Sequence, residues 1–235
     1  MQIYALSDPH LSFNRAGEEY KPMHIFGDSW EHHGEKIRRH WLNCVQEDDV
    51  VLLPGDISWA MNLEELQPDL EFLAALPGKK ILSKGNHDLW WESVTKIKKY
   101  LPENFFVLHN NSYVFDDVAV CGTRGWPCPE KNFATAQDEK IFQRELGRLE
   151  RSLASVPPEV PHKIAMFHYP PINVLHEKSA FVSLMEQYHV TICLYGHLHS
   201  YAIQTALEGE HWGIQFQLVS ADYLKFQPKA IWPVL

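Results

Sequence analysis

Short apolar runs alternate with longer amphipathic stretches along most of this chain. Runs rich in β-branched and aromatic residues predict buried strands at residues 2–6, 50–53, 80–83, 118–121, 163–167, 191–195 and 214–220. Apolar residues three or four positions apart predict helices near residues 37–45, 66–73 and 141–153. From about residue 201 onward the pattern predicts further antiparallel strands or a second sheet. Strands that alternate with helices indicate the α/β class, and we expect residues 1–235 to form a single domain.

Five of the predicted strands end in a small or turn residue that is followed by polar side chains. These polar residues are Asp8 and His10, then Asp56, then Asn86, His87 and Asp88, then His168, and finally His197 and His199. Each position alone has a structural explanation, such as a turn, a helix cap or a hydrogen-bonded core histidine. In open α/β sheets, however, ligands bind just outside the carboxyl ends of the strands. Five equivalent positions therefore favour one shared site.

The types of these residues are typical of a metal centre. Asp8 and His10 are two positions apart, so an extended chain points both to the same side, and His197 and His199 have the same spacing. Carboxylate, imidazole and amide donors without thiolates suit Mn, Fe, Co or catalytic Zn. Seven donors exceed one tetrahedral site and fit two ions about 3.5–4 Å apart. Two divalent ions would outweigh the charges of Asp8 and Asp56, and the surplus would attract a phosphate group and a hydroxide.

Composition narrows the classes of partner. Lys and Arg number 21 against 30 Asp and Glu, so the formal net charge is −9. This negative net charge disfavours sequence-independent binding of nucleic acid over a broad surface, although it does not exclude a nuclease. No apolar stretch approaches the 18 or so residues of a membrane-spanning helix, and the N-terminus lacks the features of a signal peptide. With four cysteines and no Cys-x-x-Cys pair, we expect a cytoplasmic protein without membrane association.

The motifs Asp8-x-His10, Gly55-Asp56, Gly85-Asn86-His87-Asp88, His168 and Gly196-His197-x-His199 stand in this order along the chain. In this the sequence resembles the calcineurin-like metallophosphoesterases. Longer strings at residues 7–13, 55–59, 85–91 and 122–126 resemble a bacterial branch of predicted phosphohydrolases. The resemblance implies an α/β fold of two facing mixed β-sheets flanked by helices, in αββα layers.

The resemblance also implies roles for single residues. The ligands of one ion would be Asp8, His10, Asp56 and His199. Those of the other ion would be Asp56, Asn86, His168 and His197, with Asp56 bridging the two. A hydroxide between the ions would attack the phosphorus of a phosphomonoester or phosphodiester. His87 would stabilise the transition state or protonate the leaving oxygen, and Asp88 would orient it. Pro9 departs from relatives but should not remove a ligand.

Other candidates lie around this set. Arg124 is expected either to clamp a phosphate oxygen or to brace its loop through a salt bridge. Tryptophans near the motifs either line a pocket for a base or sugar or pack in the core; they are Trp59, Trp90, Trp91 and Trp126. The segment between the first strand and the first helix is interpreted as an active-site loop or cap. Its histidines, His24, His32 and His33, are expected to lie mostly on the surface.

The leading hypothesis is a metal-dependent phosphoesterase that acts on a small phosphorylated substrate, nucleotide-like if the tryptophans line the pocket. The alternative from another class is a binding or scaffold protein that kept the fold and lost catalysis. The complete ligand set and the presence of His87 favour the enzyme. The sequence also lacks the phosphate-binding and nucleophile motifs of rival enzyme classes. It leaves the oligomeric state, the native metal pair and the choice between monoester and diester open.

Overall fold

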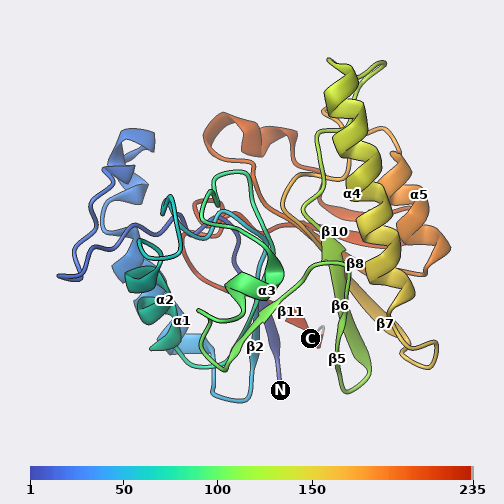
Figure 1. Cartoon of the computed structure of the whole chain (residues 1–235). Coiled ribbons are helices and arrows are strands. Elements are labelled where there is room, and N and C mark those ends of the chain that lie inside the picture. The colour runs from blue at the N-terminus through green and yellow to red at the C-terminus, as the bar shows by residue number, and fades with distance from the viewer. Residues whose placement is uncertain (234–235) are drawn as a thin grey trace. The chain divides into compact units, whose positions relative to one another are not determined.

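A computed structural model describes residues 1–233, which form two compact units. The first unit comprises Met1–Val107 with the described part of Val219–Leu235, and the second comprises Leu108–Leu218. Each unit is built on one mixed β-sheet with helices packed against it (Figure 1). The α/β class and the two mixed sheets flanked by helices are thus confirmed.

The sheet of the first unit has five strands. In spatial order they are β11 (Lys229–Trp232), β1 (Ile3–Ala5), β2 (Val50–Leu53), β3 (Lys79–Leu82) and β4 (Phe105–Val107). Strands β1 to β4 run parallel, and β11 pairs with β1 in the antiparallel sense. The loops that leave β1, β2 and β3 therefore start from the same edge of the sheet, as predicted.

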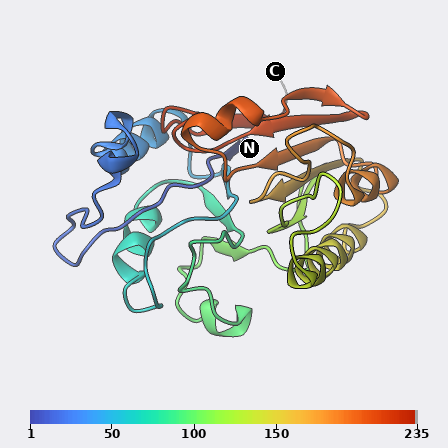
Figure 2. The ribbon, with the colours of Figure 1, turned by 90° about the horizontal axis from the view of Figure 1, so that it is seen from above.

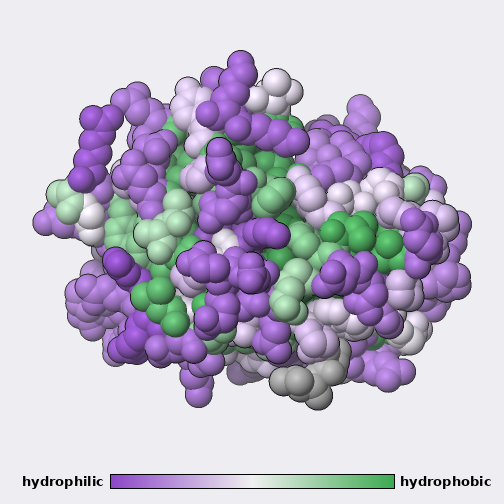
Figure 3. Space-filling model, turned by 90° about the horizontal axis from the view of Figure 1, so that it is seen from below, coloured by the Kyte–Doolittle hydropathy of each residue, from purple (hydrophilic) through white to green (hydrophobic). Residues whose placement is uncertain are grey.

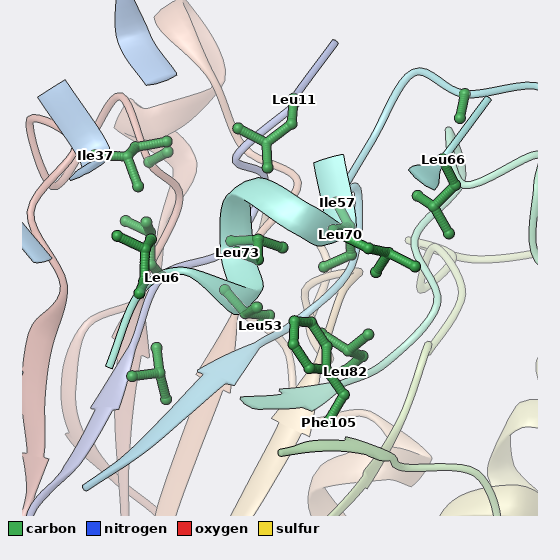
Figure 4. Close-up of a cluster of buried hydrophobic side chains, with 14 of the residues drawn as sticks. Leu6, Leu11, Ile37, Leu53, Ile57, Leu66, Leu70, Leu73, Leu82 and Phe105 are labelled. Atoms are coloured by element: carbon green, nitrogen blue, oxygen red, sulfur yellow. The ribbon is translucent and has the colours of Figure 1, made fainter. Parts of the chain in front are cut away.

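Helices of the first unit bury apolar residues in a cluster shared with the strands of this sheet. They are η1 (Met23–Phe26), η2 (Asp28–Trp30), α1 (His33–Cys44), α2 (Gln67–Ala74) and α3 (Val94–Ile97). The two helices predicted near residues 37–45 and 66–73 are confirmed as α1 and α2. Leu70 and Leu73 of α2 lie in one buried cluster with Leu53 and Leu82 of the strands below (Figure 4). This cluster fixes the strands whose ends carry the polar loops.

The sheet of the second unit has six strands. In spatial order they are β5 (Tyr113–Phe115), β6 (Val118–Thr123), β7 (His162–Phe167), β8 (Ile192–Tyr195), β10 (Ile214–Leu218) and β9 (Gly209–His211). Strands β6, β7, β8 and β10 run parallel, while β5 and β9 are antiparallel edge strands. The strand-rich end of the chain therefore divides, because β9 and β10 join this sheet and β11 joins the first.

Two helices cover this second sheet. They are α4 (Ala136–Ala154) and α5 (Ala180–Gln187), which lie side by side in Figures 1 and 2, and a short turn η3 (Ser200–Thr205) follows β8. The Thr135 side chain caps α4 by accepting the Asp138 N–H at 3.0 Å. Of the stripe predicted on α4, Phe142, Leu149 and Leu153 are buried, and Ile141 and Leu146 are half-buried. The Phe142 ring lies 4.6 Å from that of Phe181 on α5.

One face of the molecule is mostly polar. On the face shown in Figure 3, hydrophilic side chains cover most of the area and hydrophobic patches lie between them. Of the helices in residues 1–233, none is both long and apolar enough to span a membrane.

Candidate metal and catalytic site

The loops after β1 and β2 are joined by backbone hydrogen bonds beyond the ends of the strands. The Asp8 N–H donates to the carbonyl of Gly55 at 3.0 Å, and the His10 N–H donates to the carbonyl of Asp56 at 3.0 Å. His10 Nε2 lies 3.8 Å from Asp56 Oδ2. Asp8, His10 and Asp56 are all buried, with at most 5% of each exposed. The parallel pairing of the strands thus brings together three of the predicted ligands.

Four of the seven predicted ligands have a left-handed backbone. The φ angles are 57° at Asp8, 45° at His10, 51° at Asp56 and 70° at His197. Residues with a Cβ avoid this region at a cost of about 1–2 kcal/mol each. Such strain persists where the surrounding structure holds it, and it is concentrated at functional sites. The backbone therefore supports a functional role for these loops.

Asp88 is a fully buried carboxylate that holds two of these loops together. Its five donors, at 2.7–3.3 Å, are the backbone N–H groups of Gly85, Asp56, Ile57 and Ser58 and the indole N–H of Trp90. Burial raises the pKa of Asp88 to about 6, while these hydrogen bonds favour the charged form. The expected role in orienting the His87 ring stays a prediction. What the structure shows is a carboxylate that orders the turns after β2 and β3.

The turn after β3 wraps around the carboxylate of Asp56. The His87 N–H donates to Asp56 Oδ1 at 2.7 Å. A Cβ added at Gly85 would lie 2.0 Å from the same oxygen. Residue 85 must therefore be a glycine for the chain to approach Asp56 this closely. Asn86, a predicted ligand, lies between these two contacts.

Aromatic rings pack against two candidate site histidines of the first unit, His10 and His87. The Trp59 ring stacks on the His10 ring at 5.0 Å and 22°, and lies 4.6 Å from the His87 ring. The Trp59 indole N–H donates to the Met23 sulfur at 3.1 Å. The Trp30 ring lies edge-on to the His10 ring at 5.9 Å, a contact that sequence reasoning missed. Trp59 therefore positions imidazole rings, and its proposed contact with substrate stays a prediction.

The remaining tryptophans and histidines of this unit divide between core and surface. Trp90 and Trp91 are buried, as the core alternative predicts. His24 and His32 are exposed, as expected. The surface expectation is wrong for His33, which is fully buried with Nε2 3.2 Å from the carbonyl of His10. Burial also lowers the pKa of the His33 imidazole. His33 thus packs behind a predicted ligand.

The segment between β1 and α1, predicted to be an active-site loop, lines a groove of about 1580 Å³ together with α2. Phe13, Tyr20 and Trp30 are among the lining residues. None of the predicted ligands in the described part of this unit lines the groove. The segment therefore both borders the groove and contacts His10 through Trp30.

A second buried carboxylate, Asp69 of α2, supports the same loops from behind. Its Oδ1 accepts the Phe13 N–H at 2.7 Å, and its Oδ2 accepts the hydroxyl of Ser58. Only 1% of Asp69 is exposed. Burial raises the pKa of Asp69 to about 7, although the bonds from Ser58 and Phe13 oppose the shift.

We expect Asp69→Asn to make folding stability less sensitive to pH. The folded-state pKa of about 7 exceeds the ordinary value of 3.8, so the folded protein binds this proton more tightly. Protonation of Asp69 therefore stabilises the folded state fully below about pH 4, and this stabilisation is lost as the pH rises through 7. Between about pH 5 and pH 8 the loss is about 3 kcal/mol. Urea unfolding of parent and variant at both pH values measures it, and identical pH dependence in the two proteins would contradict this reading.

In the second unit, polar residues follow three neighbouring parallel strands. Arg124 follows β6, His168 follows β7, and His197 follows β8. The N–H groups of His168 and Tyr169 donate to the carbonyl of Arg124 at 3.1 and 2.9 Å. The Gly196 N–H donates to the carbonyl of His168 at 3.1 Å. These bonds hold the three loops side by side at the carboxyl edge of this sheet.

Two imidazoles of the second unit, those of His168 and His197, lie beside the Tyr169 ring. The centroid of the His168 ring lies 5.1 Å from that of His197, and the Tyr169 ring lies 4.4 Å from His197. His168 is fully buried, and His197 and His199 are half-buried. Sequence reasoning missed Tyr169, for which the only signal was its position directly after His168.

The chemistry of the donors fits divalent metal ions. The first unit supplies carboxylate, imidazole and amide groups from Asp8, His10, Asp56 and Asn86. The second supplies the imidazoles of His168, His197 and His199. All are oxygen and nitrogen donors, which suit Mn, Fe, Co and catalytic Zn. The buried thiols of Cys121 and Cys193 lie within strands, and burial raises the pKa of both.

Comparison with known proteins adds to this geometry. The sequence model of a family described as calcineurin-like phosphoesterase matches residues 1–201. Among curated proteins, none is similar enough to count as a match.

Two solved structures share the fold over nearly the whole chain. A phosphopantetheinyl hydrolase from Mycobacterium tuberculosis has a TM-score of 0.63 at 14% identity, with 99% of this chain and 96% of that one covered. A protein of unknown function from Aquifex aeolicus has a TM-score of 0.51 at 15% identity, with 97% and 95% covered. At these identities the likeness shows the fold alone.

Proposed function

We propose that this chain, which belongs to the calcineurin-like phosphoesterase family, hydrolyses a phosphomonoester or phosphodiester with the help of two divalent metal ions. The observation that carries the proposal is the complete set of oxygen and nitrogen donors on loops at the carboxyl ends of the parallel strands. The left-handed backbone at four of the donors supports it. In this proposal the two units act as one phosphoesterase domain.

The proposed ligands divide between two metal sites. One site uses Asp8, His10, Asp56 and His199, and the other uses Asp56, Asn86, His168 and His197. Within the first unit, the 3.8 Å separation of His10 and Asp56 supports their sharing of one ion. Within the second unit, the adjacent rings of His168 and His197 place two imidazoles at one edge. Bound divalent ions would supply Lewis acidity and an activated water.

The chain's own residues would bind and protonate the substrate. His87 is exposed, and its ring is held against Trp59, so it is proposed to donate a proton to the leaving oxygen. Asp88 is proposed to hold the loop that carries His87 in position, because its carboxylate accepts the backbone N–H groups of Asp56 and Gly85. Arg124 is proposed to contact a phosphate oxygen, and Trp126 and Trp59 to border a small, nucleotide-like substrate.

Two further lines bear on the choice between an enzyme and a silent scaffold. The solved relative from Mycobacterium tuberculosis is described as a hydrolase, so this fold supports hydrolysis elsewhere. All the predicted ligands and His87 are present here, which a scaffold would not need.

The four cysteines are free thiols, which accords with a proposed location in the reducing cytoplasm.

The test of the proposal is metal content together with hydrolysis. We expect close to two transition-metal ions per chain by elemental analysis, because seven donors exceed a single tetrahedral site. Reconstitution with Mn, Fe, Co or Zn should then restore hydrolysis in a screen of phosphomonoesters, phosphodiesters and nucleotides. A protein that is fully active with one ion or none would overturn the two-metal proposal. A protein that binds two ions and hydrolyses none of the esters would favour the scaffold.

A further inference from the structure

Three arginines surround one buried carboxylate in the second unit. Glu145 of α4 is fully buried and accepts a hydrogen bond from Thr123 Oγ1 at 2.7 Å. Its Oε1 accepts a hydrogen bond from Arg148 Nη1 at 2.6 Å. The same oxygen lies 3.7 Å from Arg144 Nε and 3.8 Å from Arg124 Nη2. Three positive charges therefore face one negative charge.

This balance differs from that of an ordinary buried ion pair. A buried carboxylate needs one well-placed cation, and a further cation has a desolvation cost where it is itself buried. That cost applies to Arg124, with 16% of its side chain exposed, more than to Arg148 at 28% or Arg144 at 53%. Burial lowers the pKa of Arg124, Glu145 opposes that shift, and Arg144 and Arg148 add to it by repulsion. The guanidinium nonetheless stays charged at neutral pH because its ordinary value is so high. One arginine is enough to neutralise the charge of Glu145, so the cluster keeps two positive charges in excess.

Arg124 also carries a donor that the protein does not use. Its Nε is buried and has no hydrogen-bond partner among the described residues. Its guanidinium is 4.8 Å from the centroid of the Trp126 ring, which restricts its orientation. Buried donors are nearly always satisfied, so an unused one indicates a place for an acceptor. A planar guanidinium held in this way matches the paired oxygens of a phosphate.

The arginines lie beside the proposed catalytic edge of the same unit. The carbonyl of Arg124 accepts the N–H of His168 at 3.1 Å, so the two residues occupy neighbouring strand ends. The Trp126 ring is 5.3 Å from Tyr169, which in turn is 4.4 Å from His197. Arg124 is thus bonded through its backbone to His168, and the rings of Trp126 and Tyr169 link its side chain to His197.

We infer that Arg124, with Arg144 and Arg148, binds a second phosphate group of the substrate, carried by the alcohol that leaves. This inference rests on the proposed function and narrows its substrate class to esters with two separated phosphates. The ions would hold the phosphate that is cleaved, and the arginine cluster would hold the one that is kept. Binding of the second group through paired N–H donors would act chiefly on KM.

The test compares two esters that differ in one group. They are 3-hydroxypropyl phosphate and propane-1,3-diyl bisphosphate, assayed with the metal-loaded protein. We expect kcat/KM to be about tenfold higher for the bisphosphate, well above the roughly twofold gain from its two equivalent phosphates. In Arg124→Gln this preference should shrink to about twofold, chiefly through a higher KM for the bisphosphate.

Arg151→Gln provides a matched control. Arg151 lies on the same helix α4, is exposed, and bonds to Asn110 Oδ1 at 3.2 and 3.3 Å rather than to Glu145. Its loss should leave the preference unchanged. A second readout is calorimetric binding of propane-1,3-diylbisphosphonate and 3-hydroxypropylphosphonate to the metal-free protein. The bisphosphonate should bind more tightly, and Arg124→Gln should remove that advantage.

The outcomes separate this inference from the proposed function. Equal kcat/KM for the two esters in the parent, or an equal loss of preference in Arg151→Gln, would overturn the inference and leave the phosphoesterase standing. Failure to hydrolyse either ester, with the Arg124-dependent binding advantage intact, would count against the proposed enzyme and support the anion site. A circular dichroism spectrum of each variant confirms that it is folded.

Discussion

Replacing Asp56 with asparagine is expected to abolish hydrolysis and to weaken both metal sites at once. The proposal gives this carboxylate to both ions, and Asn removes the negative charge that they would share. Residues that only orient metal ligands are worth about 10–100-fold in metal affinity, so a shared ligand should be worth more than about 100-fold. Titration of the metal-free variant with Mn or Zn, followed by calorimetry, measures the two affinities.

Asp49→Asn is the matched control for this substitution. Asp49 precedes β2 whereas Asp56 follows it, and Asp49 is likewise a mostly buried carboxylate that accepts backbone N–H bonds, from Gln2 at 2.7 Å and Gln46 at 2.9 Å. Its substitution should lower the free energy of unfolding and leave both metal affinities unchanged. If Asp56→Asn retains two ions at the affinity of the parent, the bridging assignment is wrong.

The loops of the site could be located from sequence because their signal is local. An apolar strand followed by a small residue and a metal-binding side chain needs no information from elsewhere in the chain. Strand β2 has the predicted bounds, Val50–Leu53, and α4 covers its predicted stripe. Helices α1 and α2 each contain all but one terminal residue of theirs. The parallel pairing then places Asp8 and Asp56 together, as the common edge of a sheet requires.

Short elements were harder to predict because few residues carry their periodicity. Helix α5 has eight residues, and strands β4, β5 and β9 have three each. A window of 11 or more residues is needed to separate helical from strand periodicity, roughly three helical turns. The stability of these elements comes from contacts such as that of Phe181 with Phe142, which are distant in sequence.

Contacts that support the ligands could not be read from sequence either. Asp88 is predicted to act on its neighbour His87, and its observed bonds also reach 30 to 32 residues back to the turn at Asp56–Ser58. Trp30 and His33 contact His10 from a segment whose course no pattern specifies. In the sequence, Glu145 cannot be distinguished from the exposed charged residues of an amphipathic helix, although in the structure it is fully buried. In each case tertiary packing decides the role of the residue.

His87→Ala is expected to keep the fold and both metals but to lose rate in proportion to the basicity of the leaving group. The imidazole is exposed, and its ring lies 4.6 Å from Trp59 and 5.7 Å from His10. From this position it can donate a proton to the departing oxygen, a contribution typically worth about 10²–10⁴-fold. An alkoxide is a poor leaving group unless it is protonated, whereas a stable aryloxide leaves readily without a proton. The loss should therefore be largest for alkyl esters and small for activated aryl esters.

Single-turnover rates on a matched series of leaving groups decide the role of His87, with His189→Ala as the control. His189 is an exposed histidine in the turn that precedes β8, so its loss should leave every rate unchanged. A loss in His87→Ala that is equal across the series would mean that the imidazole stabilises charge on phosphorus instead of protonating the leaving oxygen. Loss of a metal ion would make it a ligand or a support for Asp56, whose Oδ1 accepts the His87 N–H at 2.7 Å. That backbone bond survives in alanine, so retention of both ions is the expected result.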